Sequence, residues 1–177
     1  MNTKNLLLLA SLAFAMPLSA QTPQEDFKRD ITLSASNYVA YRGPQKQLTP
    51  APKGYKPFYL SHYGRHGSRY MIGNKAYDVP YFSLLKAKQE GKLTAKGEET
   101  LEKVKLIRDD AKGRDGELTP LGAIQHQGIT KRMMERFPEI FAGKTNIEAR
   151  STVVIRCILS MENGLQQMLR MNPQLNI

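Results

Sequence analysis

The chain has 177 residues, with 26 lysines and arginines against 16 aspartates and glutamates, and its formal net charge is +10 at pH 7. This surplus favours an anionic partner: a nucleic acid, an acidic membrane or a highly phosphorylated small molecule. The sequence contains no nucleic-acid-binding motif. The single cysteine excludes an internal disulfide, and the three histidines lack the spacing of metal ligands. A small anionic partner is therefore expected, and a generally basic surface is the alternative.

Residues 1–20 have the pattern of a secretory signal peptide. A lysine near the start is followed by an apolar run over residues 6–18 and by a small-residue cleavage site before Gln21. The run is too short to span a bilayer comfortably. We therefore expect an exported protein, periplasmic or secreted, with no stable membrane anchor and with its functional domain in residues 21–177. An uncleaved N-terminal anchor is the alternative.

The first half of the exported chain predicts one strand and two helices. Residues 21–56 are polar and punctuated by prolines, which indicates an irregular lead-in. Lys56–Ser61 is predicted to be a short, partly buried strand. Val79–Gln89 is predicted to be a helix, and Thr94 is expected to cap a second helix that ends at Gly113.

The second half predicts two further helices and one more strand. Thr119, followed directly by a proline, is a strong start for a third helix, which Pro138 closes. Residues 146–149 are predicted to form a brief strand. A strongly amphipathic helix follows, capped by Ser151 or Thr152. Strands separated by helices indicate an α/β fold.

The most informative feature of the sequence is the motif Arg65-His66-Gly67-Ser68-Arg69, which follows the first predicted strand. The two guanidinium groups favour a neutral, nucleophilic imidazole, and their planar forks match phosphate oxygens. The glycine lets the backbone approach an anion closely. The motif therefore predicts an anion site with a nucleophilic histidine, and a solvated basic loop is the alternative.

A second motif, Arg150–Ser160 (RSTVVIRCILS), lies at the start of the last predicted helix. Arg150 stands directly before that helix, and a guanidinium beside the free amides of a helix N-terminus favours anion binding. Taken alone, Arg150 has an alternative role, in which it caps the helix or forms an ion pair near the end of a strand. The prediction that it binds an anion therefore depends on its combination with the first motif.

Together these motifs resemble the N-terminal part of the histidine acid phosphatases, branch 2 of the histidine phosphatase superfamily. Within that family the sequence is most similar to the multiple inositol polyphosphate phosphatases and phytases. Three blocks carry the resemblance, in order: Arg65–Tyr70, Leu118–Gly122 and Arg150–Ser160, with Gly164 and Leu165 beyond the last. The resemblance implies the N-terminal portion of a three-layer α/β fold like that of phosphoglycerate mutase.

The resemblance also implies a phosphomonoesterase that removes phosphate from inositol polyphosphates such as phytate, without a cofactor or metal. It assigns His66 as the nucleophile, which takes the phosphoryl group as a phosphohistidine that water later hydrolyses. It assigns Arg65, Arg69 and Arg150 to binding the phosphate. Three fixed cations suit this reaction, because a loose phosphoryl-transfer transition state spreads its charge over three equatorial oxygens.

The chain departs from the family pattern at two places. Met71 stands where the family usually has a proline, which we expect to alter a turn. The family's general acid belongs to a later His-Asp or His-Ala-Glu motif, but no histidine follows His126. We therefore expect an N-terminal fragment that holds half an active site, with a non-catalytic domain that binds phosphate or polyanions as the alternative. His62 and His126 are expected to be structural.

Overall fold

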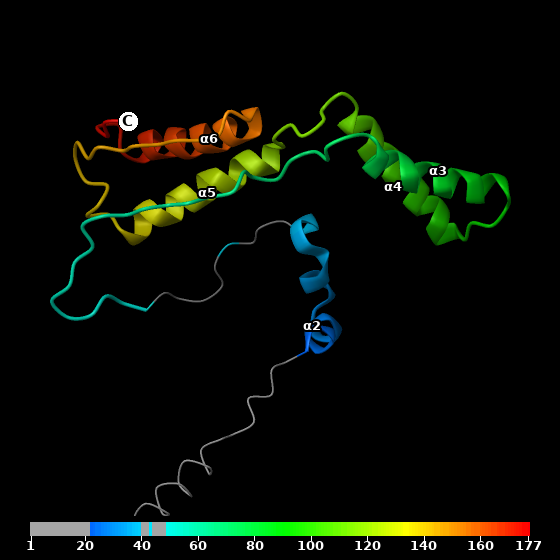
Figure 1. The fold of residues 1–177 in the computed structure, drawn as a ribbon, viewed down its shortest axis with the longest axis horizontal. Helices are drawn as coiled ribbons and strands as arrows, with labels where there is room; N and C mark the ends of the chain where they lie inside the picture. The colour runs from blue at the N-terminus through cyan, green and yellow to red at the C-terminus, as the bar shows by residue number, and fades with distance from the viewer. Residues whose placement is uncertain (1–21, 40–42, 44–48) are drawn as a thin grey trace, which may run out of the picture. The chain divides into compact units, whose positions relative to one another are not determined.

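The computed structural model describes residues 22–39, 43 and 49–177, and the predicted signal peptide lies outside them. The chain divides into two compact units, Met1–Tyr41 and Arg42–Ile177. In the first unit the described elements are α2 (Pro23–Arg29) and the 3-10 helix η1 (Ile31–Tyr38). The second contains α3 (Lys75–Gln89), α4 (Ala95–Ala111), α5 (Pro120–Arg136) and α6 (Ile155–Met171), shown in Figure 1. No described helix has the length and apolar composition needed to cross a membrane.

Local capping signals set the starts of α4 and α5, as predicted. Thr94 Oγ1 accepts a hydrogen bond from the backbone N–H of Gly97 at 3.2 Å, and Thr119 Oγ1 accepts one from Gly122 at 3.1 Å. A proline occupies the first helical position of α5. Such a cap contributes about 1 kcal/mol to stability. The first turn of α5 is therefore fixed by its own sequence.

The predicted starts of α3 and α6 are wrong by several residues. α3 begins at Lys75 rather than Val79 and carries Pro80 in its second turn. α6 begins at Ile155, and its N-cap, Val154, provides no side-chain hydrogen bond. The predicted cap fails because the hydroxyl of Ser151 donates instead to the carbonyl of Thr152, at 2.7 Å.

The prediction of a three-layer α/β fold is wrong, because the described residues form helices and no sheet. A strand exists only through a ladder of hydrogen bonds to a neighbouring strand. The described part of the chain offers residues 56–66 no backbone–backbone hydrogen bond, although they are extended. Phe58 on this segment is 94% exposed. The second predicted strand is reduced to an isolated parallel bridge between Asn146 and Asn176.

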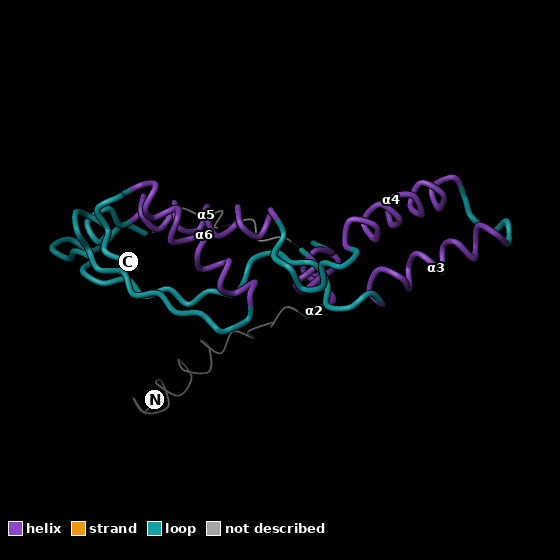
Figure 2. Tube along the Cα trace, turned by 90° about the horizontal axis from the view of Figure 1, so that it is seen from above, coloured by secondary structure: helices purple, strands orange, loops and turns teal. Residues whose placement is uncertain are grey.

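A small apolar core joins the helices α5 and α6 to two extended segments, residues 56–66 and 145–153. Its buried members are Met134, Phe141 and Leu175. Leu60 and Ile147, one from each extended segment, pack against them. Figure 2 shows both segments on the same side of the α5–α6 pair. This core therefore holds the segment that leads to His66 against the two helices.

Candidate active site

A cavity of about 1020 Å³ lies between the α5–α6 pair and the two extended segments. Apolar side chains of both helices form much of its wall. These include Ile129, Met133, Met161 and Leu165. Polar lining residues come from the His66 motif and from facing positions on the helices. These include His62, Arg65, His66, His126 and Ser160. The described residues contain no cluster of His, Cys, Asp and Glu that could hold a metal ion.

His66 is half-buried, and the loop that follows it holds its ring. Nδ1 of His66 lies 2.8 Å from the backbone oxygen of Gly67. A carbonyl oxygen only accepts hydrogen bonds, so Nδ1 is the nitrogen that carries the hydrogen in this contact. In the neutral ring the lone pair is then on Nε2. The contact therefore leaves Nε2 in the form required of a nucleophile.

The loop after His66 is bound to the first two turns of α5. The N–H and the hydroxyl of Thr119 both donate to the Ser68 carbonyl at 2.9 Å, and the Ser68 N–H donates to Gln125 Oε1 at 2.8 Å. A Cβ added at Gly67 would lie 2.4 Å from the carbonyl oxygen of Gly122, and one at Gly122 would lie 2.3 Å from that of Ser68. The two glycines therefore let the loop and the helix backbone touch.

The same loop is bound to the first turns of α6 through Ser160, which is 3% exposed. The N–H of Gly67 donates to Ser160 Oγ at 3.0 Å, and the Ser160 hydroxyl donates to the backbone oxygen of Arg156 at 2.7 Å. These two bonds connect the second sequence motif to the first, across 93 positions of the chain. They bring the start of α6 to the loop after His66.

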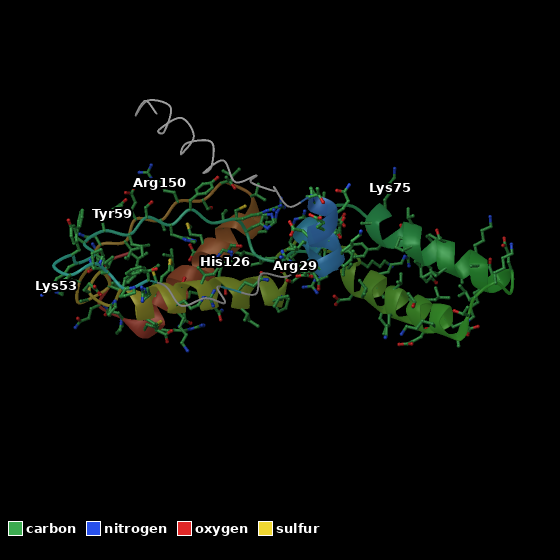
Figure 3. All side chains as sticks on the ribbon, turned by 90° about the horizontal axis from the view of Figure 1, so that it is seen from below. Arg29, Lys53, Tyr59, Lys75, His126 and Arg150 are labelled. Carbon is green, nitrogen blue, oxygen red and sulfur yellow. The ribbon has the colours of Figure 1, made fainter. Side chains whose placement is uncertain are left out.

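The structure places Arg65 and Arg150 among the residues that line the cavity. Arg65 is exposed. The guanidinium of Arg150 is paired with Glu148, and the side chain of Arg150 is 86% exposed. Figure 3 shows this side chain pointing away from the helices. Arg150 is therefore close to the cavity, but its charge is engaged elsewhere.

Arg69 and Arg156 border the segment that precedes α5 rather than the described cavity lining. Arg69 forms an isolated antiparallel bridge with Leu118 and donates from Nη1 to the backbone oxygen of Tyr70 at 2.8 Å. Arg156 donates from Nη1 to the Gly116 carbonyl at 3.4 Å. Within the described part of the chain, the buried Nε of each arginine has no hydrogen-bond partner. A buried N–H of a cation that lacks a protein acceptor suits an anion.

Sequence reasoning did not single out Arg156. The sequence feature that pointed to Arg156 was its spacing from Ser160. The two residues are one helical turn apart, so the serine hydroxyl reaches the backbone carbonyl of Arg156. That spacing became informative only when the structure showed Ser160 in contact with Gly67. Through Ser160, the hydrogen bonds connect Arg156, rather than Arg150, to the loop after His66.

His126, which the sequence predicts to be structural, lines the cavity with His62 and His66. Burial lowers its pKa below the ordinary value of 6.5, and the two other histidines lower it further. The nearby backbone of Arg65 opposes this shift by raising the pKa. The ring is therefore neutral at pH 7. His126 follows His66 by 60 residues, so nothing in the local sequence indicated that both side chains line the same cavity.

No family model matches the chain, and no curated protein matches it. Among solved structures, the chain is similar to the multiple inositol polyphosphate phosphatase of Bifidobacterium longum, crystallised in complex with inositol hexasulfate. The sequence identity is 25% and the TM-score is 0.55. The match covers 77% of this chain and 30% of that one, so the chain spans less than a third of the neighbour's length. The structural neighbour is thus a phosphatase of the kind that the sequence motifs resemble.

Proposed function

We propose that the chain is the nucleophile-bearing part of a phosphatase that forms a phosphohistidine at His66. The observation that carries this proposal is the contact between His66 Nδ1 and the Gly67 carbonyl, which leaves Nε2 as the nucleophilic nitrogen. The similarity to a phosphatase supports the reaction class. The neighbour's name and the net charge of +10 support inositol polyphosphates as substrates. The proposed enzyme is exported, as residues 1–20 predict.

In the first step of this reaction, Nε2 of His66 attacks phosphorus, an N–P bond forms and the ester P–O bond breaks. The substrate alcohol leaves with its bonding electron pair, and it needs a proton. The phosphorylated ring is cationic, so the hydrogen bond from Nδ1 to the Gly67 carbonyl becomes charge-assisted and stronger. In the second step, water attacks phosphorus, the N–P bond breaks, and inorganic phosphate leaves the neutral histidine. Arg65 and Arg69 are proposed to bind the phosphate oxygens in both steps.

Phosphorylation of His66 tests the mechanism directly. The protein is mixed with nitrophenyl phosphate carrying labelled phosphorus, quenched without acid, digested and mapped. We expect the label on His66, and we expect His66→Gln to reduce labelling by at least about a thousandfold, because the amide cannot replace the nucleophile. Label on a serine, or a requirement for added metal, would contradict the mechanism. Tight phosphate binding without any label would instead identify a non-catalytic domain that binds polyanions.

The third phosphate-binding cation is tested by comparing Arg150→Ala with Arg156→Ala. The two variants lose the same charge, so they are matched for the general attraction of an anion. We expect Arg156→Ala to weaken phosphate binding about 10- to 100-fold, since a hydrogen bond to a charged group contributes about 1.5–3 kcal/mol. Arg150→Ala should weaken it less than about threefold, because exposed ion pairs contribute little. Titration calorimetry with inorganic phosphate measures both. A larger loss of phosphate binding in Arg150→Ala than in Arg156→Ala would instead support Arg150 as the third phosphate-binding cation.

A further inference from the structure

Two consecutive peptide groups of the loop after His66 are each hydrogen-bonded to a helix. The peptide between His66 and Gly67 donates its N–H to Ser160 Oγ, on α6, at 3.0 Å. The next peptide, between Gly67 and Ser68, donates its N–H to Gln125 Oε1, on α5, at 2.8 Å. In Figure 1 the chain passes the N-terminal end of α5 at this point. Side chains of both helices therefore hold the backbone directly after the nucleophile.

The second of these peptides also holds the ring of the nucleophile. Its carbonyl, that of Gly67, accepts the hydrogen bond from His66 Nδ1 at 2.8 Å. A trans peptide is planar, so its N–H and its C=O point in opposite directions from one rigid unit. A bond that fixes the N–H therefore also fixes the direction of the carbonyl. Gln125 thus determines where the His66 ring finds its acceptor.

Gly67 makes this anchor necessary, because the backbone of a glycine is the least restricted of all residues. The position requires a glycine, since a Cβ there would lie 2.4 Å from the carbonyl oxygen of Gly122. Close packing against α5 therefore places the most freely rotating residue directly after the nucleophile. Gln125 lies three residues after Gly122, on the same face of the helix. Its side chain limits the rotation by holding the next N–H of the loop.

The two hydrogen bonds of this peptide also strengthen each other. The amide oxygen of Gln125 polarises the peptide through the Ser68 N–H, and this makes the Gly67 carbonyl a stronger acceptor. The effect grows when His66 is phosphorylated, because the ring is then cationic and the bond from Nδ1 is charge-assisted. An amide accepts the N–H without bringing a negative charge to a site that binds phosphate.

We propose that Gln125 is a positioning residue of the phosphatase reaction, a role that rests on the function proposed above. By holding the Ser68 N–H, it keeps the Gly67 carbonyl on Nδ1 of the nucleophile and the lone pair on Nε2. The tautomer of a histidine is set by the hydrogen bond of its other ring nitrogen. Loss of Gln125 lets the peptide rotate, so part of the molecules carry the proton on Nε2 and cannot attack phosphorus.

The tautomer of His66 in the full chain is measured first, because it does not depend on catalysis. Heteronuclear NMR of protein with isotope-labelled histidine rings reports which ring nitrogen carries the proton, at a pH well above the ordinary histidine pKa. Comparison with His66→Gln identifies the His66 signals. We expect the Nδ1–H form in the wild type. In Gln125→Met, which keeps the side chain's length but not its oxygen, the ratio of Nε2–H to Nδ1–H should rise about two- to tenfold, as for a lost neutral hydrogen bond.

The rate constant of His66 phosphorylation is then measured in a stopped-flow instrument with saturating nitrophenyl phosphate. We expect Gln125→Met to lower it about 10- to 100-fold and to change the apparent dissociation constant less than about threefold, because a displacement of about 1 Å can cost about a hundredfold in rate. Gln125→Glu restores an oxygen acceptor and should recover most of the rate constant and the Nδ1–H tautomer. Gln125→Ala removes the acceptor without filling its space, and it should repeat the loss.

Gln127→Met is the matched control, because Gln127 lies on the same helix and donates from Nε2 to Asn163 Oδ1 of α6 at 2.9 Å. We expect it to keep the wild-type tautomer ratio and a rate constant within about twofold of the wild type. The proposal is overturned if Gln125→Met keeps either the wild-type tautomer ratio or the wild-type rate constant, if Gln125→Glu recovers neither, or if Gln127→Met is equally changed.

It is also overturned if the changes in the Gln125 variants follow the melting temperature alone. A wild-type protein that shows the Nδ1–H tautomer but takes no label on His66 would instead refute the phosphatase mechanism. The NMR comparison of Gln125→Met with the wild type would in that case still decide whether Gln125 sets the tautomer.

Discussion

Gly122→Ala is expected to destabilise the protein by about 1–3 kcal/mol or more, and to abolish labelling of His66 where the fold survives. The added Cβ would lie 2.3 Å from the Ser68 carbonyl oxygen and 2.7 Å from a methyl carbon of Leu118. The Ser68 carbonyl cannot retreat freely, because it accepts two hydrogen bonds from Thr119. The loop must therefore separate from α5. Urea unfolding measures the change in the free energy of unfolding.

Gly128→Ala, in the same helix, is the control for this substitution. Its Cβ would lie 3.3 Å from Nη1 of Arg132, the far end of a flexible side chain. Replacing a helical glycine with alanine stabilises a helix by up to about 1 kcal/mol when nothing clashes. We therefore expect Gly128→Ala to be neutral or stabilising. Equal stability of the two alanine variants would show that the packing of the loop after His66 does not depend on Gly122.

The starts of α4 and α5 could be predicted from the sequence because helix capping is local. Thr94 and Thr119 each bond an N–H three residues ahead, so a short stretch of sequence contains the whole interaction. The start of α6 could not be predicted in this way, because the Ser151 hydroxyl had two possible partners. Ser151 donates to the carbonyl of Thr152, and the sequence gave no means of choosing between this contact and a helix cap.

The predicted sheet failed because a strand is defined by its neighbour. The residues from Lys56 to Ser61 do extend, but the described chain places no second strand beside them. Prediction of the site from local sequence is limited in the same way. The motif around His66 was recognisable because its residues are consecutive, whereas Arg156 and His126 reach it through the packing of α6 and α5. Contacts such as Gly67 with Ser160 have no counterpart in local sequence.

The chain is expected to phosphorylate His66 readily from nitrophenyl phosphate but about 100- to 10,000-fold more slowly from inositol phosphates, which is the range that general acid catalysis provides. Nitrophenolate leaves as a stable anion, whereas an inositol alkoxide needs a proton. Among the described cavity-lining residues the only carboxylate side chain is that of Glu148, which is ion-paired with Arg150 and exposed. Burial lowers the pKa of His126, so the protonated form that could donate a proton is scarce at pH 7. Neither Glu148 nor His126 is therefore an evident proton donor for the leaving group.

Single-turnover rates with nitrophenyl phosphate, phenyl phosphate and inositol hexakisphosphate, measured at one pH, check this expectation. The rates should fall in that order, because the leaving group becomes more basic along the series. Glu148→Gln serves as the control, and it should leave all three rates nearly unchanged if this carboxylate donates no proton. Equal rates for inositol hexakisphosphate and nitrophenyl phosphate would mean that a donor is present within the chain. Selective loss of the inositol phosphate reaction in Glu148→Gln would then identify that donor, because only a basic leaving group depends on it.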